Sequence, residues 1–346
     1  MGRTPSPQVS ILPEVSILIV SYNTRELTLA AIDAVVRETR TPHEIIVIDN
    51  ASSDGSPQAI ASHPAAPRLI ALKDNIGFGR ANNLAARYAR ADMLLLLNPD
   101  TVVLDHAIDE LLEFARRNPG AKIWGGRTLF ANGDLNPSSC WQRISVWSTL
   151  CRTSGLAAIF TSSSLFNSEA IGGWARDSER QVDIVSGCFF MIPTSLWTEL
   201  GGFDEAFYMY GEEADLCLRA HRLGARPAIT PRATIIHLGG ASERTRAAKM
   251  IKLLAAKMTL IDRHLPAWQR PLARHLMRVW PLTRLIALRS AHLVSRSDRF
   301  NGGAAEWREV WRRRNEWQTG YHGARAAADD EASMLDGTRP MNPTVH

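Results

Sequence analysis

Five side chains, spread along the chain, could bind a cation or take up a proton. Asp49 and Asp100 each follow an apolar run. Glu212 and Glu213 open a stretch with helical spacing, and His237 closes another apolar run. Carboxylates and imidazole bind divalent cations, and a positioned carboxylate can act as a general base. The expected secondary structure indicates whether these groups meet.

The first hundred residues alternate between expected strands and helices. Helical spacing covers Glu26–Arg37, a short segment after Ser56 and a segment ending near Arg90. The expected strands are Val15–Val20, Glu44–Asp49, Arg68–Leu72 and Met93–Leu97. This alternation predicts an α/β fold with a doubly wound, mostly parallel sheet. The unbroken apolar run Met93–Leu97 is typical of a strand buried on both faces.

The second half is less regular. Residues 137–178 show weak periodicity, and we interpret them as a flexible or acceptor-facing insertion. Beyond Gly240 the pattern is helical and basic, with breaks expected at prolines 266, 271 and 281. The other expected elements are strands over Lys122–Phe130, Val182–Pro193 (interrupted by Gly187) and Arg232–Leu238, and helices from Thr194 and over Glu212–Leu223.

Polar residues follow three of the expected parallel strands. They are Ser21-Tyr22-Asn23, Asp49-Asn50 and Asn98-Pro99-Asp100. Each one alone is equally consistent with an ordinary turn. Because the carboxyl ends of parallel strands share one edge, where ligands bind in open α/β sheets, three in succession favour a ligand site. There, Asp49 could accept a hydrogen bond from a nucleobase N–H or a ribose hydroxyl.

Three further motifs each allow two interpretations. Asp74–Asn83, with two glycines, is either a helix entry or a loop that approaches a diphosphate; it is not GxGxxG, so a nicotinamide cofactor is not supported. The acidic start at Glu212 either favours the helix dipole or, after the aromatic Tyr208-Met209-Tyr210, forms a carboxylate site beside a sugar ring. His237 is either a core residue or a metal ligand.

Taken together, these motifs resemble family 2 glycosyltransferases over roughly residues 14–240, and the bacterial rhamnosyltransferase-like subgroup in particular. The resemblance is carried by Val15–Asn23, Ile48–Ser56, Asn75–Gly79, Leu97–Asp100, Gly211–Arg219 and His237–Gly240. It implies a GT-A fold, a nucleotide-diphosphate sugar donor and inversion at the anomeric carbon. It also implies a glycan or lipid-linked acceptor in bacterial cell-surface polysaccharide synthesis, with dTDP-rhamnose as the first expectation for the donor and a UDP-sugar as the alternative.

The resemblance also implies roles for single residues. Asp100 would bind Mg²⁺ or Mn²⁺ at the diphosphate, with His237 as a second metal ligand. Glu213 would be the general base, and Glu212 or Asp215 would orient the acceptor or a loop. Asp49 would contact the base, and the remaining donor-binding residues would be Ser21, Asn23, Asn75, Gly77 and Asn98. The sequence departs from the family's common Asp-x-Asp motif, because Asn98 replaces the first carboxylate and predicts weaker metal binding.

Composition divides the chain. Residues 241–320 contain 17 Lys and Arg against 6 Asp and Glu. We therefore expect a disordered lead over 1–14, a catalytic domain over 15–240 (nucleotide-binding half 15–130, acceptor-binding half 131–240), a basic helical extension over 241–320 and a disordered tail over 321–346. The basic extension either packs on the catalytic domain with a solvated face or lies on an anionic membrane surface.

Other classes are less well supported. No nucleic-acid motif accompanies the basic charge, so a nucleic-acid partner is not expected. A nucleotidyltransferase would need a glycine-rich phosphate loop after the first strand, which Ser21–Arg25 lacks, and a non-catalytic sugar-nucleotide-binding module remains an alternative. Four cysteines without CxxC spacing and the absence of a secretory signal predict a cytoplasmic protein, at most peripheral on the inner face of the plasma membrane.

Overall fold

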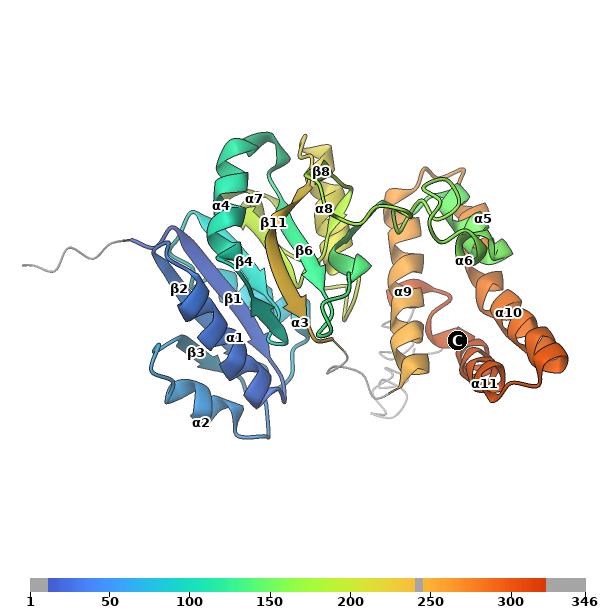
Figure 1. Ribbon diagram of the computed structural model, residues 1–346, viewed down its shortest axis with the longest axis horizontal. Helices are drawn as coiled ribbons and strands as arrows, with labels where there is room; N and C mark the ends of the chain where they lie inside the picture. The colour runs from blue at the N-terminus through green and yellow to red at the C-terminus, as the bar shows by residue number, and fades with distance from the viewer. Residues whose placement is uncertain (1–11, 240–244, 322–346) are drawn as a thin grey trace, which may run out of the picture. The chain divides into compact units, whose positions relative to one another are not determined.

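The computed structural model describes residues 12–239 and 245–321 and divides the chain into two units (Figure 1). Unit 1 comprises Met1–Arg143, Trp174–Asp204 and Glu212–Ala241, and unit 2 comprises Ile144–Gly173, Glu205–Gly211 and Ser242–His346. The sequence-based domain boundary lay at residue 240; the structure also groups two earlier segments with the C-terminal helices. The expected lead before residue 12, Gly240 of the last motif and the expected tail from residue 322 lie outside the described residues.

Unit 1 is an α/β unit. Its helices are α1 (Arg25–Glu38), α2 (Ser56–Ala61), α3 (Phe78–Ala86), α4 (Ala107–Arg117), α7 (Thr194–Leu200) and α8 (Glu212–Arg222). Its strands are β1 (Val15–Ser21), β2 (His43–Asp49), β3 (Arg68–Ala71), β4 (Met93–Leu97), β5 (Thr101–Val103), β6 (Trp124–Leu129), β7 (Cys140–Trp141), β8 (Arg180–Gln181), β9 (Ile184–Val185), β10 (Phe189–Pro193) and β11 (Ala228–His237).

The main sheet has the strand order β3-β2-β1-β4-β10-β6-β11-β5, with β8 paired to β11. β3, β2, β1 and β4 run parallel, as do β6 and β11. β10 runs antiparallel to both of its neighbours, and β5 runs antiparallel to β11. The predicted α/β class with a mostly parallel central sheet is therefore confirmed, with antiparallel strands inserted beyond β4.

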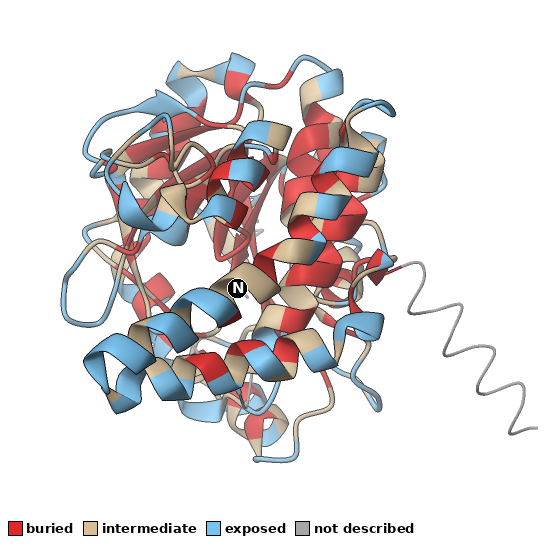
Figure 2. Cartoon of the chain, turned by 90° about the vertical axis from the view of Figure 1, so that its right-hand side faces the viewer, coloured by how far each residue is buried: buried red, intermediate tan, exposed pale blue. Residues whose placement is uncertain are grey.

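Side-chain alternation along the strands builds the core. In β1, Ile17 and Ile19 join the cluster that contains Ile32 and Val35 of α1 and Leu111 of α4. All residues of β1 are buried, so the strand is covered on both faces. Figure 2 shows buried residues gathered on the strands and on the inner sides of several helices.

β11 is longer than predicted, because it begins at Ala228 rather than Arg232 and has an irregular register between Thr230 and Thr234. The neighbouring Gly126 of β6 lies very close to this bulge: a Cβ atom there would lie 2.0 Å from the carbonyl oxygen of Ala233. Only glycine allows this approach, and the irregularity lies in the same strand whose end carries His237.

Unit 2 is helical, which confirms the predicted helical C-terminal region. It contains α5 (Val146–Ser154), α6 (Leu156–Ile159), α9 (Arg246–His264), α10 (Arg270–Ser295) and α11 (Asp298–Arg312). None of the helices within residues 12–239 and 245–321 combines the length and apolarity needed to cross a bilayer.

Two predictions about these helices were wrong. Pro281 lies inside the continuous α10, and Pro271 lies in its first turn, where a missing N–H costs little. The break falls between α9 and α10, at Pro266 as predicted.

The segment 137–178 is also more regular than its sequence pattern indicated. It contains α5, which begins with a capping box between Ser145 and Ser148, and Glu169 in a buried ion cluster.

Candidate active site

The carboxyl ends of β1 and β2 lie side by side. Ser21 pairs with Asp49 in the register, and the amide of Asn50 donates to the carbonyl of Ser21 at 2.8 Å. The hydroxyl of Ser21 is fully buried and contacts the hydroxyl of Thr28 in α1 at 3.0 Å. Its side chain therefore holds strand and helix together and does not reach solvent.

Asp49 is fully buried at this edge. Its Oδ2 accepts from the amide of Ser52 at 2.9 Å, whereas its Oδ1 is buried and has no hydrogen-bond partner among the described residues. A buried carboxylate oxygen without a donor is costly. A donor group arriving with a ligand, such as a base N–H, would satisfy it.

Loop-to-loop hydrogen bonds order the surroundings of Asp49. The exposed Asn23, at φ +51°, accepts from the amide of Ser53 at 2.8 Å and donates its own amide to Ser52 at 2.9 Å. The amide of Arg25 donates to Asp54 at 2.9 Å. The segments after β1 and β2 therefore form one connected polar edge.

Asn50 extends this edge to the next loop. Its Nδ2 donates to Oδ1 of Asn75 at 2.8 Å, and its Oδ1 accepts from the amide of Ile76 at 2.9 Å. Oδ1 of Asn75 also accepts from the amide of Gly77 at 3.0 Å. Gly77, at φ +84°, precedes α3, so this network fixes the entry of that helix. Asn50 was not among the predicted site residues, although its place directly after Asp49 could have indicated it.

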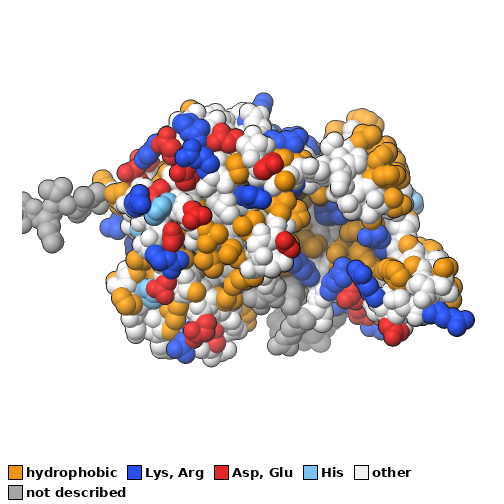
Figure 3. Space-filling model, in the orientation of Figure 1, with side chains coloured by type: hydrophobic (Ala, Val, Ile, Leu, Met, Phe, Trp, Pro, Cys, Tyr) orange, Lys and Arg blue, Asp and Glu red, His pale blue; other side chains and the backbone are white. Residues whose placement is uncertain are grey.

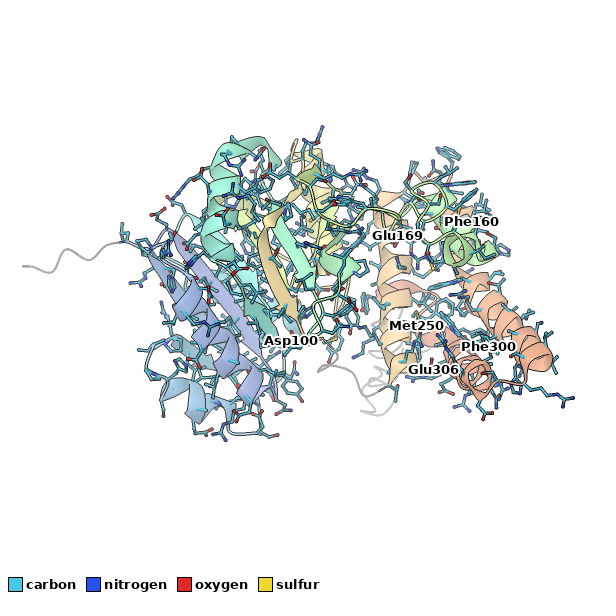
Figure 4. All side chains as sticks on the ribbon, viewed as in Figure 1. Asp100, Phe160, Glu169, Met250, Phe300 and Glu306 are labelled. Atoms are coloured by element: carbon cyan, nitrogen blue, oxygen red, sulfur yellow. The ribbon has the colours of Figure 1, made fainter. Side chains whose placement is uncertain are left out.

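Asp100 and His237 meet at the ends of distant strands. His237 Nε2 lies 3.1 Å from Asp100 Oδ1, and the amide of Gly239 donates to Oδ2 at 3.0 Å. Figure 4 labels Asp100 at the carboxyl edge of the sheet. Burial opposes ionisation of Asp100, but the hydrogen bond and charge of His237, with the backbone amides, outweigh it and lower its pKa. Asp100 is therefore a carboxylate at neutral pH.

Asn98 completes this group. Its Nδ2 lies 3.3 Å from His237 Nε2, and its Oδ1 is buried without a hydrogen-bond partner among the described residues. Across 12–239 and 245–321, no three His, Cys, Asp or Glu side chains cluster in a way that could hold a metal ion. One carboxylate, one imidazole and one orphaned amide oxygen nevertheless fit Mg²⁺ or Mn²⁺, because such ions commonly take only one or two protein carboxylates and use substrate phosphates and water for the rest.

The acidic pair begins α8. Glu212 is 4% exposed, and its Oε2 lacks a hydrogen-bond partner in the part of the chain that is described. Burial first, and then the charge of Glu213, raise the pKa of Glu212 well above its usual range. Glu213 is half-buried. The two carboxyl groups thus differ: burial and the neighbouring carboxylate disfavour the ionised form of Glu212, whereas the half-buried Glu213 is the more accessible of the two.

Asp215 belongs to a different arrangement. Its Oδ2 accepts from Arg219 Nε at 2.7 Å, and Asp215 is 1% exposed. The same guanidinium donates to the carbonyls of Leu200 at 2.6 Å and Gly202 at 2.8 Å. These contacts tie α8 to the segment after α7, so they support a structural role for Asp215.

The segment Gly187-Cys188 lies between the two halves of the site. A Cβ atom on Gly187 would lie 3.7 Å from Cβ of Glu213 and 3.7 Å from the ring of Phe78, which opens α3. The carbonyl of Cys188 accepts from the amide of Asn98 at 3.1 Å. Burial raises the pKa of the Cys188 thiol to about 11, and the charges of Asp100 and Glu213 both contribute. Asp100 and Glu213 therefore flank one short backbone segment.

Comparison with known proteins finds similarity to glycosyltransferases. The model of the glycosyl transferase family 2 matches residues 16–169. An N-acetylglucosaminyl-diphospho-decaprenol L-rhamnosyltransferase of Mycobacterium tuberculosis is 28% identical over 289 residues, which cover 75% of this chain and 85% of the relative. Rhamnosyltransferase WbbL of Escherichia coli is 28% identical over 185 residues, 51% of this chain and 66% of the relative.

A solved structure shares the fold. Mannosyltransferase PcManGT from Pyrobaculum calidifontis, determined in complex with GDP-Man and Mn²⁺, superposes with a TM-score of 0.52 over 96% of this chain and 90% of its own, at 17% identity. The predicted GT-A fold is thereby confirmed. Residues 16–169 of the chain therefore match a family 2 glycosyltransferase domain.

Proposed function

We propose that this protein is an inverting, metal-dependent glycosyltransferase that transfers a rhamnosyl group from dTDP-rhamnose to a lipid-linked glycan precursor at the cytoplasmic face of the membrane. The observation that carries the proposal is that Asn98, Asp100 and His237 meet, and that the short segment Gly187-Cys188 adjoins both Asn98 and Glu213. The names of the bacterial relatives support the sugar and the lipid-linked acceptor.

Glu213 takes the proton from the acceptor hydroxyl in this proposal. Inverting transfer needs a base on the face of the sugar opposite the leaving diphosphate, and a positioned base contributes about 10²–10⁴-fold. Burial and the charge of Glu213 raise the pKa of Glu212, which disfavours its ionised form and supports Glu213 as the base. The α8 N-terminus favours the ionised form of Glu213 before transfer.

Asp100 and His237 would hold a divalent ion, and the orphaned Oδ1 of Asn98 would be a further ligand. That ion would offset the negative charge that gathers on the leaving diphosphate. The hydrogen bond from the amide of Gly239 and the contact of His237 with Asp100 would keep these ligands in place before donor binding. A neutral amide instead of a second carboxylate supports a weaker ion affinity than an Asp-x-Asp site would have.

The donor nucleotide would bind along the polar edge that Asn23, Asp49, Asn50 and Asn75 form. Oδ1 of Asp49 would accept from the base, and the α3 entry at Gly77 would face the diphosphate with backbone amides. The test is nucleoside diphosphate release from a panel of dTDP-, UDP- and GDP-sugars with an undecaprenyl- or decaprenyl-diphosphate sugar acceptor, followed by NMR assignment of the new linkage. Selective turnover of dTDP-rhamnose with inversion supports the proposal, and turnover with retention or with no member of the panel contradicts it.

A further inference from the structure

Helix α10 carries apolar side chains on two opposite faces. One face is buried within unit 2 and includes Ala273, Met277, Trp280 and Leu285. The other face carries Leu272, Val279, Ile286 and Leu293, which recur every seven residues. Leu272, Ile286 and Leu293 are 52%, 55% and 79% exposed. A surface helix normally turns polar residues to water, so this exposed stripe, about 32 Å long at 1.5 Å per residue, requires an explanation.

The charges of α10 are all of one sign. Its 26 residues include five arginines and no Asp or Glu. Arg278 and Arg289 are exposed on the flank of the stripe and form no ion pair with any residue that the structure describes. A protein partner that covered the stripe would have to supply carboxylates to match them, whereas an anionic lipid surface supplies both an apolar interior and negative headgroups.

The neighbouring α5–α6 segment has the same character. Residues 144–168 contain no Asp or Glu, and Ile159, Phe160 and Leu165 are 72%, 46% and 58% exposed. Phe160 is labelled in Figure 4 at the end of α6. The segment is fixed to α10 by Thr153, whose hydroxyl donates to the carbonyl of Leu276 at 2.9 Å and whose carbonyl accepts from Thr283 at 2.8 Å.

Order within this segment argues against a mobile insertion. The ring of Phe166 lies 5.1 Å from that of Phe160 and 6.2 Å from that of Trp147, and the indole of Trp147 donates to the carbonyl of Leu165 at 2.8 Å. Figure 3 shows hydrophobic side chains at the surface of this unit. The exposed apolar groups are thus held outward by packing beneath them.

We propose that unit 2 binds the surface of an anionic lipid bilayer through the outward stripe of α10, with the exposed apolar residues of α5–α6 entering the same interface. The stripe inserts among the acyl chains at the headgroup boundary, and Arg278 and Arg289 contact lipid phosphates. The inference deepens the proposed function, because a lipid-linked acceptor resides in a bilayer. Vesicle binding is measured without sugar transfer, so the two proposals can fail separately.

The test is co-flotation of the full chain with phosphatidylcholine vesicles that contain or lack phosphatidylglycerol. The wild-type chain should float with the anionic vesicles, and the partition coefficient of Ile286→Glu/Leu293→Glu should fall at least about tenfold. Val36→Glu is the matched control, because Val36 is 50% exposed on α1 of unit 1 and should leave binding unchanged. Ile159→Glu/Phe160→Glu should weaken binding in the same direction as the α10 variant.

Arg278→Gln/Arg289→Gln places no charge in an apolar site. This variant tests the proposal if circular dichroism shows that the Glu variants do not fold. It should weaken binding to anionic vesicles and reduce its salt dependence. The inference is overturned if the wild-type chain does not float with anionic vesicles. It is also overturned if Ile286→Glu/Leu293→Glu and Arg278→Gln/Arg289→Gln both float to the same extent as the wild-type chain. A dimer in sedimentation that Ile286→Glu/Leu293→Glu abolishes, without vesicle binding by the wild type, would instead assign the stripe to a second copy of the chain.

Discussion

Asp100 Oδ1 and His237 Nε2 lie 3.1 Å apart, although 136 residues separate them in the chain. The pairing of β5 with β11 brings the two strand ends together, because Thr101 pairs with His237 in the register. The amide of Gly239 then fixes the second carboxylate oxygen. This pair is where we place the divalent ion.

Removing either member of the pair should therefore weaken binding of the divalent ion. We expect Asp100→Ala to lower turnover at saturating Mn²⁺ by at least about 10²-fold, because the charge on the leaving diphosphate is no longer offset. His237→Gln should raise the Mn²⁺ concentration for half-maximal activity about 10- to 100-fold. Metal titrations of donor-dependent turnover measure both. Wild-type metal dependence in Asp100→Ala would remove the metal assignment.

Asn98 offers a gain-of-affinity test. Asn98→Asp restores an Asp-x-Asp sequence and adds a negative ligand beside Asp100, so we expect the Mn²⁺ requirement to fall about tenfold. Asn98→Ala, which removes the orphaned Oδ1, should raise that requirement. Equal metal titration curves for the wild type and both variants would show that Oδ1 does not face the ion.

Substitution of Asp215 tests whether this carboxylate near the start of α8 contributes to stability rather than to turnover. Asp215→Asn leaves Arg219 without its buried partner, so we expect a loss of about 3 kcal/mol in the free energy of unfolding. Turnover per folded molecule should stay near that of the wild type. Urea denaturation and activity on the same preparation test this, with Asp33→Asn, whose side chain is 66% exposed, as a control of little effect. A catalytic Asp215 would instead show lost turnover at unchanged stability.

The sequence predicted the parallel half of the sheet better than the rest of it. Runs such as Met93–Leu97 indicate buried parallel strands, which the structure confirms, and the polar residues that follow them predict a ligand edge. Strand direction leaves no trace in apolar periodicity, so the strand expected over Val182–Pro193 was not predicted to run antiparallel, as β10 does. The three-residue β5 is too short to show a period and was not predicted. Spacing alone also could not separate Asp215 from Glu213, because the difference depends on Arg219 and the carbonyls it reaches. Likewise, Pro281 was predicted to break a helix that packing keeps continuous.

Unit 2 contains a buried ion cluster that should make stability depend on pH. Glu169 pairs with Arg152 at 3.1 Å and with Lys257. Burial alone would raise the pKa of Glu169, but these two cations lower it from 4.5 to about 2. A carboxylate with a depressed folded pKa contributes stability above its unfolded pKa. That contribution is about 3 kcal/mol and is lost as the pH falls from 4.5 toward 2.

Glu169→Gln should therefore lower the free energy of unfolding by about 3 kcal/mol or more at pH 7, because two buried cations lose their counterion. The difference from the wild type should shrink as the pH falls below 4.5. Urea denaturation across this range measures it. Glu306→Gln is the matched control, because its exposed pair with Arg246 at 3.6 Å should contribute less than about 1 kcal/mol. A pH-independent difference between Glu169→Gln and the wild type would contradict the pairing.

The assignment of Glu213 is tested most directly by measuring donor affinity and single-turnover sugar transfer in Glu213→Gln and Glu212→Gln side by side. Glu213→Gln should bind donor like the wild type and transfer sugar about 10²–10⁴-fold more slowly, because the amide cannot take the acceptor proton. Glu212→Gln should retain most of its transfer rate, since glutamine imitates the neutral carboxyl that burial imposes. Rapid transfer by Glu213→Gln, together with an inactive Glu212→Gln, would contradict the proposed mechanism.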